Sequence, residues 1–193
     1  MTECRQSDLD HDKWLKTLGI TSFLNLNILD LGCGSGYLCH KAMEQGASSA
    51  LGIDVVEPRG AGSTWQFQQL NLNEPEWHKS LSRGFDLIFA FDILEHLDSP
   101  SNFLSSCQQA LAPNGHLVLT TPNVNSWECL LNPQSWSGVR DPQHKTLFTK
   151  YSLEFLLKKS GFSQLSISAP IRKLSFLGPM QPQVGGQILC TAR

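Results

Sequence analysis

The sequence has no hydrophobic run long enough to cross a membrane. Its longest apolar stretches, such as LIFAF at 87–91, have only the length of a β-strand. The first residues, MTECRQSDLDHDK, also lack the apolar core of a signal peptide. We therefore expect a soluble, cytoplasmic protein without stable membrane association.

The sequence also has no large excess of positive or negative charge. The formal net charge is −2 and the isoelectric point is near 6.3, so the chain as a whole has no electrostatic attraction to a polyanion such as nucleic acid. We therefore expect no nucleic-acid partner. The sequence does not determine the oligomeric state.

Paired cysteines are absent. The six cysteines, at 4, 33, 39, 107, 129 and 190, show no CxxC spacing, and a chain of this size needs no disulfide staples. This pattern favours free, mostly buried thiols. No group of histidines, cysteines and acids has metal-site spacing either, so the sequence predicts no metal.

What the sequence does contain is an alternation of strand-like and helix-like segments. Apolar runs predict strands at 28–31, 50–53, 65–70, 85–91 and 116–121. Helices are expected at 37–45, which Gly46 stops, and at 100–111, after which a PNG turn at 113–115 leads into the next strand. This alternation is typical of an α/β fold with a Rossmann-like, doubly wound, mostly parallel sheet and helices on both faces.

A long insertion follows the fifth predicted strand. Residues 122–148 are rich in Asn, Pro, Ser and Trp, and a connection of this length is usually a functional lid or a disordered segment. It would form the acceptor site of an enzyme, or its apolar side chains would pack as ordinary core. Those side chains belong to Trp127, Leu130, Leu131, Trp136 and Phe148.

The remaining C-terminal segment returns to regular structure. We expect a helix at 150–160, with Thr149 as its cap and Gly161 as its stop, and then strands at 162–168 and 187–192. With 193 residues and 40% hydrophobic residues, the chain is expected to form a single domain in which residues 1–26 are an N-terminal helical segment.

The stretch NILDLGCGSGYL at 27–38 places three glycines directly after the first predicted strand. A dinucleotide-binding fingerprint would need a glycine where Tyr37 stands, and a phosphate-binding loop would need a Lys followed by Ser or Thr. The carboxylate of Asp30 would repel a pyrophosphate, whereas it would attract the ammonium of S-adenosylmethionine (SAM). The alternative is that the glycines form only a tight strand-to-helix turn.

Further candidate residues stand at the ends of the following strands. Asp54 follows the second strand, Asn71 and Leu72 follow the third, and Phe91 and Asp92 end the fourth. Ligands of open α/β sheets bind at the carboxyl ends of the strands. These residues and the glycine loop therefore indicate one common binding edge.

Together these motifs resemble the class I SAM-dependent methyltransferases, particularly the compact groups that act on small molecules. LDLGCGSG at 29–36 is similar to their first motif, and GID at 52–54 is similar to the segment with their ribose-binding acid. FDLIFAFDILEHL and LAPNGHLVLTTPN resemble their fourth- and fifth-strand motifs. The similarity runs from about Trp14 to Ala192, and the terminal GGQILCTAR implies an antiparallel last strand in a seven-stranded sheet.

The resemblance implies a set of SAM-binding residues. Asp30, Gly32 and Gly34 would surround the methionine part, with Cys33 and Gly36 in the same loop. Asp54 would bind the ribose, Leu72 would bind the adenine through its backbone, and Phe91 would pack near the base. Asn71 stands where the family often has an acid, and its amide oxygen can still accept a hydrogen bond from the adenine amino group.

The implied reaction transfers the sulfonium methyl group in line to an oxygen or nitrogen of a small-molecule acceptor, and S-adenosylhomocysteine is the product. Because the sulfonium already activates the methyl group, positioning is central and a general base is optional. The candidate catalytic residues are His144 in the insertion and His96 and Asp92 after the fourth strand. The alternatives are methylation of a macromolecule, RNA or protein, and a noncatalytic SAM-binding module.

Overall fold

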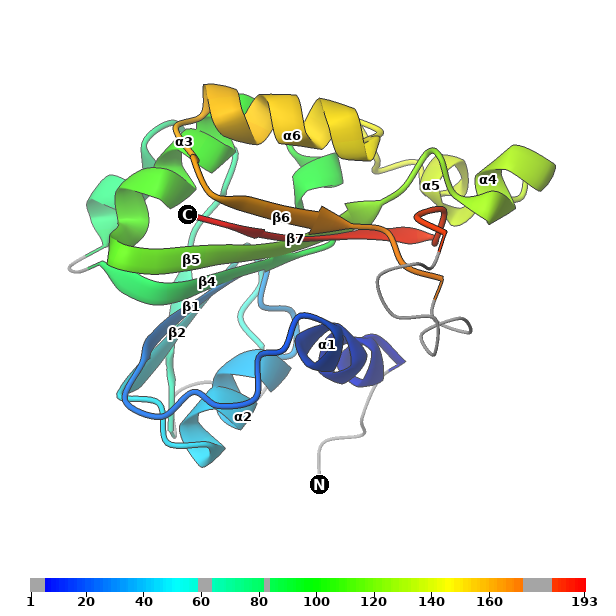
Figure 1. The fold of residues 1–193 in the computed structure, drawn as a ribbon. Coiled ribbons are helices and arrows are strands. Elements are labelled where there is room, and N and C mark those ends of the chain that lie inside the picture. The colour runs from blue at the N-terminus through cyan, green and yellow to red at the C-terminus, as the bar shows by residue number, and fades with distance from the viewer. Residues whose placement is uncertain (1–5, 59–63, 82–83, 172–181) are drawn as a thin grey trace.

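A computed structural model describes residues 6–58, 64–81, 84–171 and 182–193 (Figure 1). These residues form a seven-stranded sheet in the order β3-β2-β1-β4-β5-β7-β6. Neighbouring strands from β3 to β5 pair in parallel, and β7 pairs antiparallel with both β5 and β6. The predicted Rossmann-like sheet is therefore confirmed. Its strands are β1 (Asn27–Leu31), β2 (Ser49–Asp54), β3 (Gln66–Gln69), β4 (Phe85–Phe91), β5 (Leu111–Pro122), β6 (Leu165–Ser168) and β7 (Gln187–Ala192).

The central strands are apolar because helices cover both faces of the sheet. α1 (Gln6–Thr17) and α2 (Tyr37–Glu44) lie on one face, and α3 (Pro100–Ala110) and α6 (Lys150–Lys159) lie on the other (Figure 1). Successive residues of a strand point to opposite faces, so a strand covered on both sides reads as a continuous apolar run. Ile28, Leu29, Ile88 and Phe89 of β1 and β4 accordingly have 0% exposure.

Local sequence signals set the ends of these helices. Thr149 caps α6 in a capping box, in which the Ser152 N–H donates to Thr149 Oγ1 at 3.1 Å. Gly46 and Gly161 follow α2 and α6 with φ of +85° and +100°, a left-handed conformation that ends a helix. All three helices predicted from the sequence exist, and each ends one residue before its predicted end.

Two predicted strand boundaries are wrong. β5 begins at Leu111, directly after α3, so the predicted turn at 113–115 lies inside this strand. Phe85 pairs with Leu111 but Leu87 pairs with His116, which shows that the extra residues are accommodated as an irregularity in the pairing. β6 begins at Leu165 rather than at residue 162, because the Phe162 N–H still donates to the carbonyl of Leu157 in α6, at 3.1 Å.

The insertion contains two short helices, α4 (Trp127–Leu131) and α5 (Ser137–Arg140), beyond the carboxyl ends of the parallel strands (Figure 1). Asn123 anchors its start, since this residue is 0% exposed and its Nδ2 donates to the carbonyl of Gly185 at 2.9 Å. The apolar residues of the insertion divide into two groups. Trp136 and Phe148 are buried, whereas the side chains of α4 are exposed: Trp127 58%, Leu130 63% and Leu131 68%.

Two single-turn 3-10 helices complete the described structure, η1 (Trp77–Ser80) and η2 (Leu94–His96). The cysteines within the described residues are free thiols, four of them buried, and Cys4 lies outside those residues. No helix in the described ranges is long and apolar enough to cross a membrane.

Candidate active site

The glycine loop joins β1 to α2 at the carboxyl edge of the sheet. Gly32, Gly34 and Gly36 have φ of +75°, +51° and +76°, a conformation that disfavours other residues. The Gly32 N–H donates to the carbonyl of Ile53 at 2.8 Å, which ties the loop to the end of β2. A Cβ at Gly36 would overlap the ring of Trp65, whereas a Cβ at Gly34 would meet no heavy atom within 4 Å. The loop is therefore packed at Gly36 and open at Gly34.

Asp30 is a buried carboxyl in β1, two residues before Gly32. It is 3% exposed, and no side-chain hydrogen bond or ion pair to it occurs within the described residues. Burial, followed by the charge of Asp54, raises the pKa of Asp30 to about 7. A cation beside this carboxyl would stabilise its charged form. The residue therefore fits the ammonium of SAM and would oppose a pyrophosphate.

Asp54 ends β2 and contacts the same loop. Its Oδ2 accepts from the Gly34 N–H at 2.9 Å, and its Oδ1 accepts from the Val55 N–H at 2.7 Å. Oδ1 also accepts from the Val56 N–H at 3.3 Å, so the lone pair left on Oδ2 is the one that can accept from a ribose hydroxyl. The structure thus brings Asp30, Gly34 and Asp54 into one group that fits the amino-acid and ribose parts of SAM.

Cys33 lies within this group as a buried thiol with 6% exposure. Burial is the main cause that raises the pKa of Cys33, and the charges of Asp30 and Asp54 raise it further. The N-terminus of α2 would favour a thiolate, but burial outweighs it. Cys33 is therefore a buried thiol, and its place in the cofactor site remains a prediction.

The predicted adenine-side residues lie at two separate strands, Asn71 and Leu72 after β3 and Phe91 at the end of β4. Asn71 is exposed, and its side-chain oxygen accepts from the Asn73 N–H at 3.0 Å, while Leu72 is a core residue with 7% exposure. Phe91 is also 7% exposed, and its ring packs edge-on against Trp14 of α1 with centroids 5.2 Å apart. The SAM-binding roles of Asn71, Leu72 and Phe91 remain predictions.

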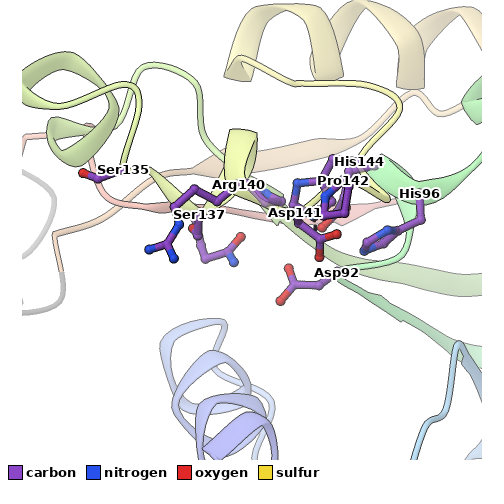
Figure 2. A pocket seen from close by; sticks show the side chains of 11 residues that line it. Asp92, His96, Ser135, Ser137, Arg140, Asp141, Pro142 and His144 are labelled. Atoms are coloured by element: carbon purple, nitrogen blue, oxygen red, sulfur yellow. Dashed lines mark ion pairs between the residues drawn. The ribbon is translucent and has the colours of Figure 1, made fainter.

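A cavity of about 650 Å³ opens beside the end of β4 (Figure 2). All three predicted catalytic candidates line it: Asp92, His96 and His144. Gln187 also lines it, a residue that sequence reasoning missed. The pairing of Gln187 with Pro122 in the sheet carries this C-terminal residue to the site, and no local pattern around position 187 indicates that proximity.

Asp92 follows β4 with φ of +50°, a conformation that non-glycine residues adopt at a cost. Its Oδ1 accepts from Thr120 Oγ1 at 2.9 Å, and its N–H donates to the Thr120 carbonyl at 3.1 Å. Burial raises the pKa of Asp92 to about 6, and the Thr120 hydrogen bond partly offsets this effect. Asp92 is therefore held in place as a carboxylate that is mostly charged at neutral pH.

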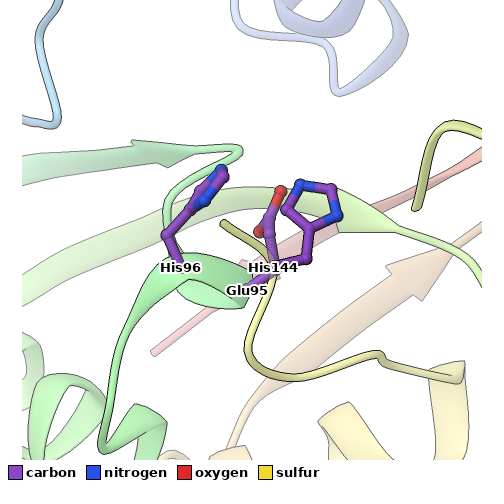
Figure 3. A group of neighbouring side chains, drawn as sticks. All are labelled: Glu95, His96 and His144. Atoms are coloured by element: carbon purple, nitrogen blue, oxygen red, sulfur yellow. The ribbon is translucent and has the colours of Figure 1, made fainter. Parts of the chain in front are cut away.

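His96 and His144 come from distant parts of the sequence but have ring centroids only 4.7 Å apart. Glu95, with 1% exposure, lies between them (Figure 3), and its Oε2 accepts from Thr121 Oγ1 at 2.8 Å. Sequence reasoning missed Glu95. The available signal was its place directly before His96, in the same turn after β4.

A second cavity, of about 890 Å³, adjoins the first and shares Asp92 and Gln187 with it. Trp14 of α1 and Trp136 of the insertion contribute aromatic side chains to its lining. Neither cavity is lined by the glycine loop or by Asp54. Both are therefore candidates for the acceptor rather than for the cofactor.

Comparisons with known proteins bear on the family and the fold of this chain. A family model described as a methyltransferase domain matches residues 4–167. The tRNA U34 carboxymethyltransferase of Ectopseudomonas mendocina is 32% identical over 170 residues, which cover 79% of this chain and 50% of that protein. The ubiquinone biosynthesis O-methyltransferase of Acinetobacter baumannii is 29% identical over 106 residues, covering 51% of this chain and 44% of that protein. The chain spans about half the length of the curated relatives it matches.

Among solved structures, a SAM-dependent methyltransferase from Archaeoglobus fulgidus is similar with a TM-score of 0.74 and 20% sequence identity. The match covers 98% of this chain and 96% of that one. At this level of identity, the likeness shows the fold alone.

Proposed function

The chain belongs to the methyltransferase domain family of class I SAM-dependent enzymes, and on that premise we propose that it methylates an oxygen or nitrogen of a small-molecule acceptor. The observation that carries the proposal is the cavity of about 650 Å³ beside Asp92, next to the edge that carries the glycine loop. A cavity of this size suits a small organic molecule.

The residues proposed to hold the cofactor are those whose surroundings fit its parts. Asp30 offers a buried carboxyl for the ammonium, Gly34 leaves open space beside the loop, and Asp54 offers an acceptor for a ribose hydroxyl. When bound, SAM supplies a methyl group on a positively charged sulfur, from which a nucleophile can take it directly.

Asp92 is the proposed base for the acceptor. It lies in the cavity wall, Thr120 fixes its carboxyl group, and above its pKa of about 6 it can accept a proton from an acceptor hydroxyl or amine. His96 and His144, the other two candidates, line the same cavity, and each has its Nδ1 at hydrogen-bond distance from a backbone carbonyl. Asp92 is proposed ahead of them because it directly follows β4, beside the strand that leads into the glycine loop.

The charges around the two cavities support an uncharged or cationic acceptor. Carboxyl groups from α1, from the turn after β4 and from the insertion line them, whereas Arg140 is the one Lys or Arg among the described lining residues. The carboxyl groups belong to Asp10, Asp92, Glu95, Glu128 and Asp141. Such a lining would repel a phosphate-rich acceptor.

A nucleotide of tRNA is the second candidate acceptor. It is favoured by the 32% identical relative, whose name is tRNA U34 carboxymethyltransferase. The shared segment covers only 50% of that protein, so features that bind its tRNA can lie outside the segment.

The test is transfer of label from methyl-labelled SAM to separate pools of phenols, alcohols, amines and total tRNA. We expect label in a small molecule and, for Asp92→Asn, a loss of rate of about 10²-fold or more with SAM binding retained. Glu154→Gln is the matched control, because this carboxylate is on α6 and pairs with Lys158 away from the cavities. Label in tRNA alone would overturn the small-molecule proposal. A normal rate in Asp92→Asn would overturn the role of Asp92, and SAM binding without transfer to any pool would favour a noncatalytic module.

A further inference from the structure

We infer that Glu95, His96 and His144 form a binding site for one divalent metal ion in the wall of the acceptor cavity. This inference departs from the expectation drawn from the sequence, which contains no compact metal-ligand spacing. The fold creates the group by placing the His144 segment of the insertion against η2, which carries the other two residues.

The donor atoms are close enough for a common ion. One carboxylate oxygen of Glu95 and one ring nitrogen from each histidine all lie within 4.8 Å of one another, and the carboxylate lies between the two rings (Figure 3). Ligand atoms bound to one metal at about 2.0–2.2 Å are separated by roughly 3–4 Å. Small side-chain rotations therefore suffice to close the site.

Both histidines have the hydrogen bonding expected of metal ligands. His96 Nδ1 lies 3.3 Å from the carbonyl oxygen of Gln143, and His144 Nδ1 lies 2.8 Å from that of Gly138. A carbonyl oxygen can only accept, so each Nδ1 carries a hydrogen and Nε2 is the nitrogen left to bind a metal; in His144 this atom lies 3.8 Å from Asp141 Oδ2. Metal-bound histidines in proteins are usually oriented in this way by a second hydrogen bond.

Glu95 has an unused acceptor. Thr121 satisfies Oε2, but Oε1 is fully buried and has no hydrogen-bond partner among the described residues. A buried oxygen without a donor is costly, and an ion at this position would compensate that cost. The unpartnered atom therefore points independently to a positively charged ligand.

The backbone keeps the two segments together. The N–H groups of Lys145 and Thr146 both donate to the carbonyl of Glu95, at 2.8 and 3.1 Å. His144 directly precedes these residues, so its position relative to η2 is fixed by main-chain hydrogen bonds. The three ligands are therefore held together before any ion binds.

The donor set defines the class of metal. Two imidazoles and one carboxylate suit Zn²⁺, Fe²⁺, Mn²⁺ or Co²⁺ better than Ca²⁺, which prefers oxygen ligands alone. Three protein ligands also leave coordination positions for water or for an acceptor atom. Because Glu95, His96 and His144 all line the cavity of about 650 Å³, such an atom can come from a molecule bound there.

The test measures metal binding directly and does not depend on methyl transfer. Protein treated with EDTA and dialysed is titrated with Zn²⁺ by calorimetry and with Co²⁺ by visible absorption. We expect one ion per chain and Co²⁺ absorption bands typical of bound nitrogen ligands. In Glu95→Gln and His144→Gln, the affinity for the metal should fall by at least 10-fold. Loss of a group that only supports a ligand already costs about 10-fold or more, so loss of a ligand should cost at least as much. His96→Gln/His144→Gln should lose stoichiometric binding.

His116→Gln is the matched control, because His116 is an exposed histidine on β5, outside the cluster. It should bind metal like the wild type. SAM titration of each variant shows that it is folded, and if Glu95→Gln fails to fold, the histidine variants decide the result. The inference is overturned if the wild type binds no ion stoichiometrically, or if the double histidine variant retains wild-type affinity. Metal binding without methyl transfer would leave the metal site intact and count only against the proposed function.

Discussion

At pH 8, replacing Asp30 with Asn should stabilise the cofactor-free protein and, at the same time, weaken its binding of SAM. Both effects have the same cause, a carboxyl that is 3% exposed and has no partner among the described residues. Burial of this group and the neighbouring charge of Asp54 oppose its ionisation, and an amide of nearly the same shape avoids that cost.

The magnitude follows from the pKa, which rises from 3.8 in the unfolded chain to about 7 in the folded one. The folded state then binds more protons than the unfolded state between these values, so the contribution of Asp30 to stability decreases as the pH rises from about 4 to 7. At about 1.4 kcal/mol per pKa unit, this shift lowers the stability of the folded state by roughly 4 kcal/mol at pH 8, where Asp30 is charged, and by roughly 1.5 kcal/mol at pH 5, where it is protonated. The amide hydrogens of the Asn side chain would find no acceptor there, which reduces the gain in stability by about 1–3 kcal/mol at both pH values.

Urea unfolding of the wild type and Asp30→Asn at pH 5 and pH 8 measures this difference. The free energy of unfolding of the variant relative to the wild type should increase by about 2.5 kcal/mol from pH 5 to pH 8. The cost of burying the amide is the same at both pH values, so it does not affect this difference. Glu44→Gln is the control, since Glu44 is an exposed carboxylate on α2 and should show no such change. A difference that stays constant with pH would refute the reasoning.

Calorimetric titration with SAM measures the opposite effect. Loss of one hydrogen bond to a charged group costs about 1.5–3 kcal/mol, so Asp30→Asn should bind SAM roughly 10- to 150-fold more weakly at pH 8. Wild-type affinity should decrease as the pH falls below 7, because SAM must then displace a proton from Asp30, and the variant should lack this dependence. Equal affinities at pH 8 would exclude Asp30 from the ammonium site.

Three further predictions concern Asp54 and the glycine loop that it contacts. Asp54→Ala should bind SAM about 10- to 150-fold more weakly, because each hydrogen bond to a charged group contributes about 1.5–3 kcal/mol, and unchanged affinity by calorimetry would exclude the ribose role. Gly36→Ala should destabilise the fold by roughly 2–5 kcal/mol through left-handed strain and overlap with Trp65, as urea unfolding can measure. Gly34→Ala should reduce the free energy of unfolding by only about 1–2 kcal/mol, but it should bind SAM poorly. Gly19→Ala is the control, because Gly19 also has a left-handed conformation, with φ of +73°, and open space around it. This variant should lose the same stability and bind SAM normally.

The sequence predicted the sheet well because its main signals are local. β4 and β7 have the predicted bounds, 85–91 and 187–192, since a strand covered on both faces needs an unbroken apolar run. Helix ends were also predictable from Thr149, Gly46 and Gly161, whose effects act within one turn. The start of β5 was not, because Pro-Asn-Gly at 113–115 favours a turn, and only the pairing with β4 shows that the strand passes through it.

The same difference between local and long-range signals applies to the candidate site. Asp30, the glycines and Asp54 lie in short motifs beside strand ends, so their proximity follows from the topology. His144 approaches Glu95 only because the insertion packs across the ends of β4 and β5, and Gln187 arrives through antiparallel pairing. No local pattern encodes these contacts, which is why the spacing of metal-ligating residues in the sequence gave no sign of the cluster.

The carboxyl edge of the sheet carries two separate concentrations of uncompensated acidity. Asp30 and Asp54 form one beside the glycine loop, and Asp92 and Glu95 form the other in the acceptor cavity. Burial opposes the ionisation of Asp30, Asp92 and Glu95, which reduces the stability of the charged protein, so each concentration is explained if a cation binds there. On our proposals these cations differ, an ammonium at the first and a metal ion at the second. SAM and a divalent metal should therefore each raise the thermal stability of the wild type, and Asp30→Asn should abolish most of the SAM effect while leaving the metal effect unchanged.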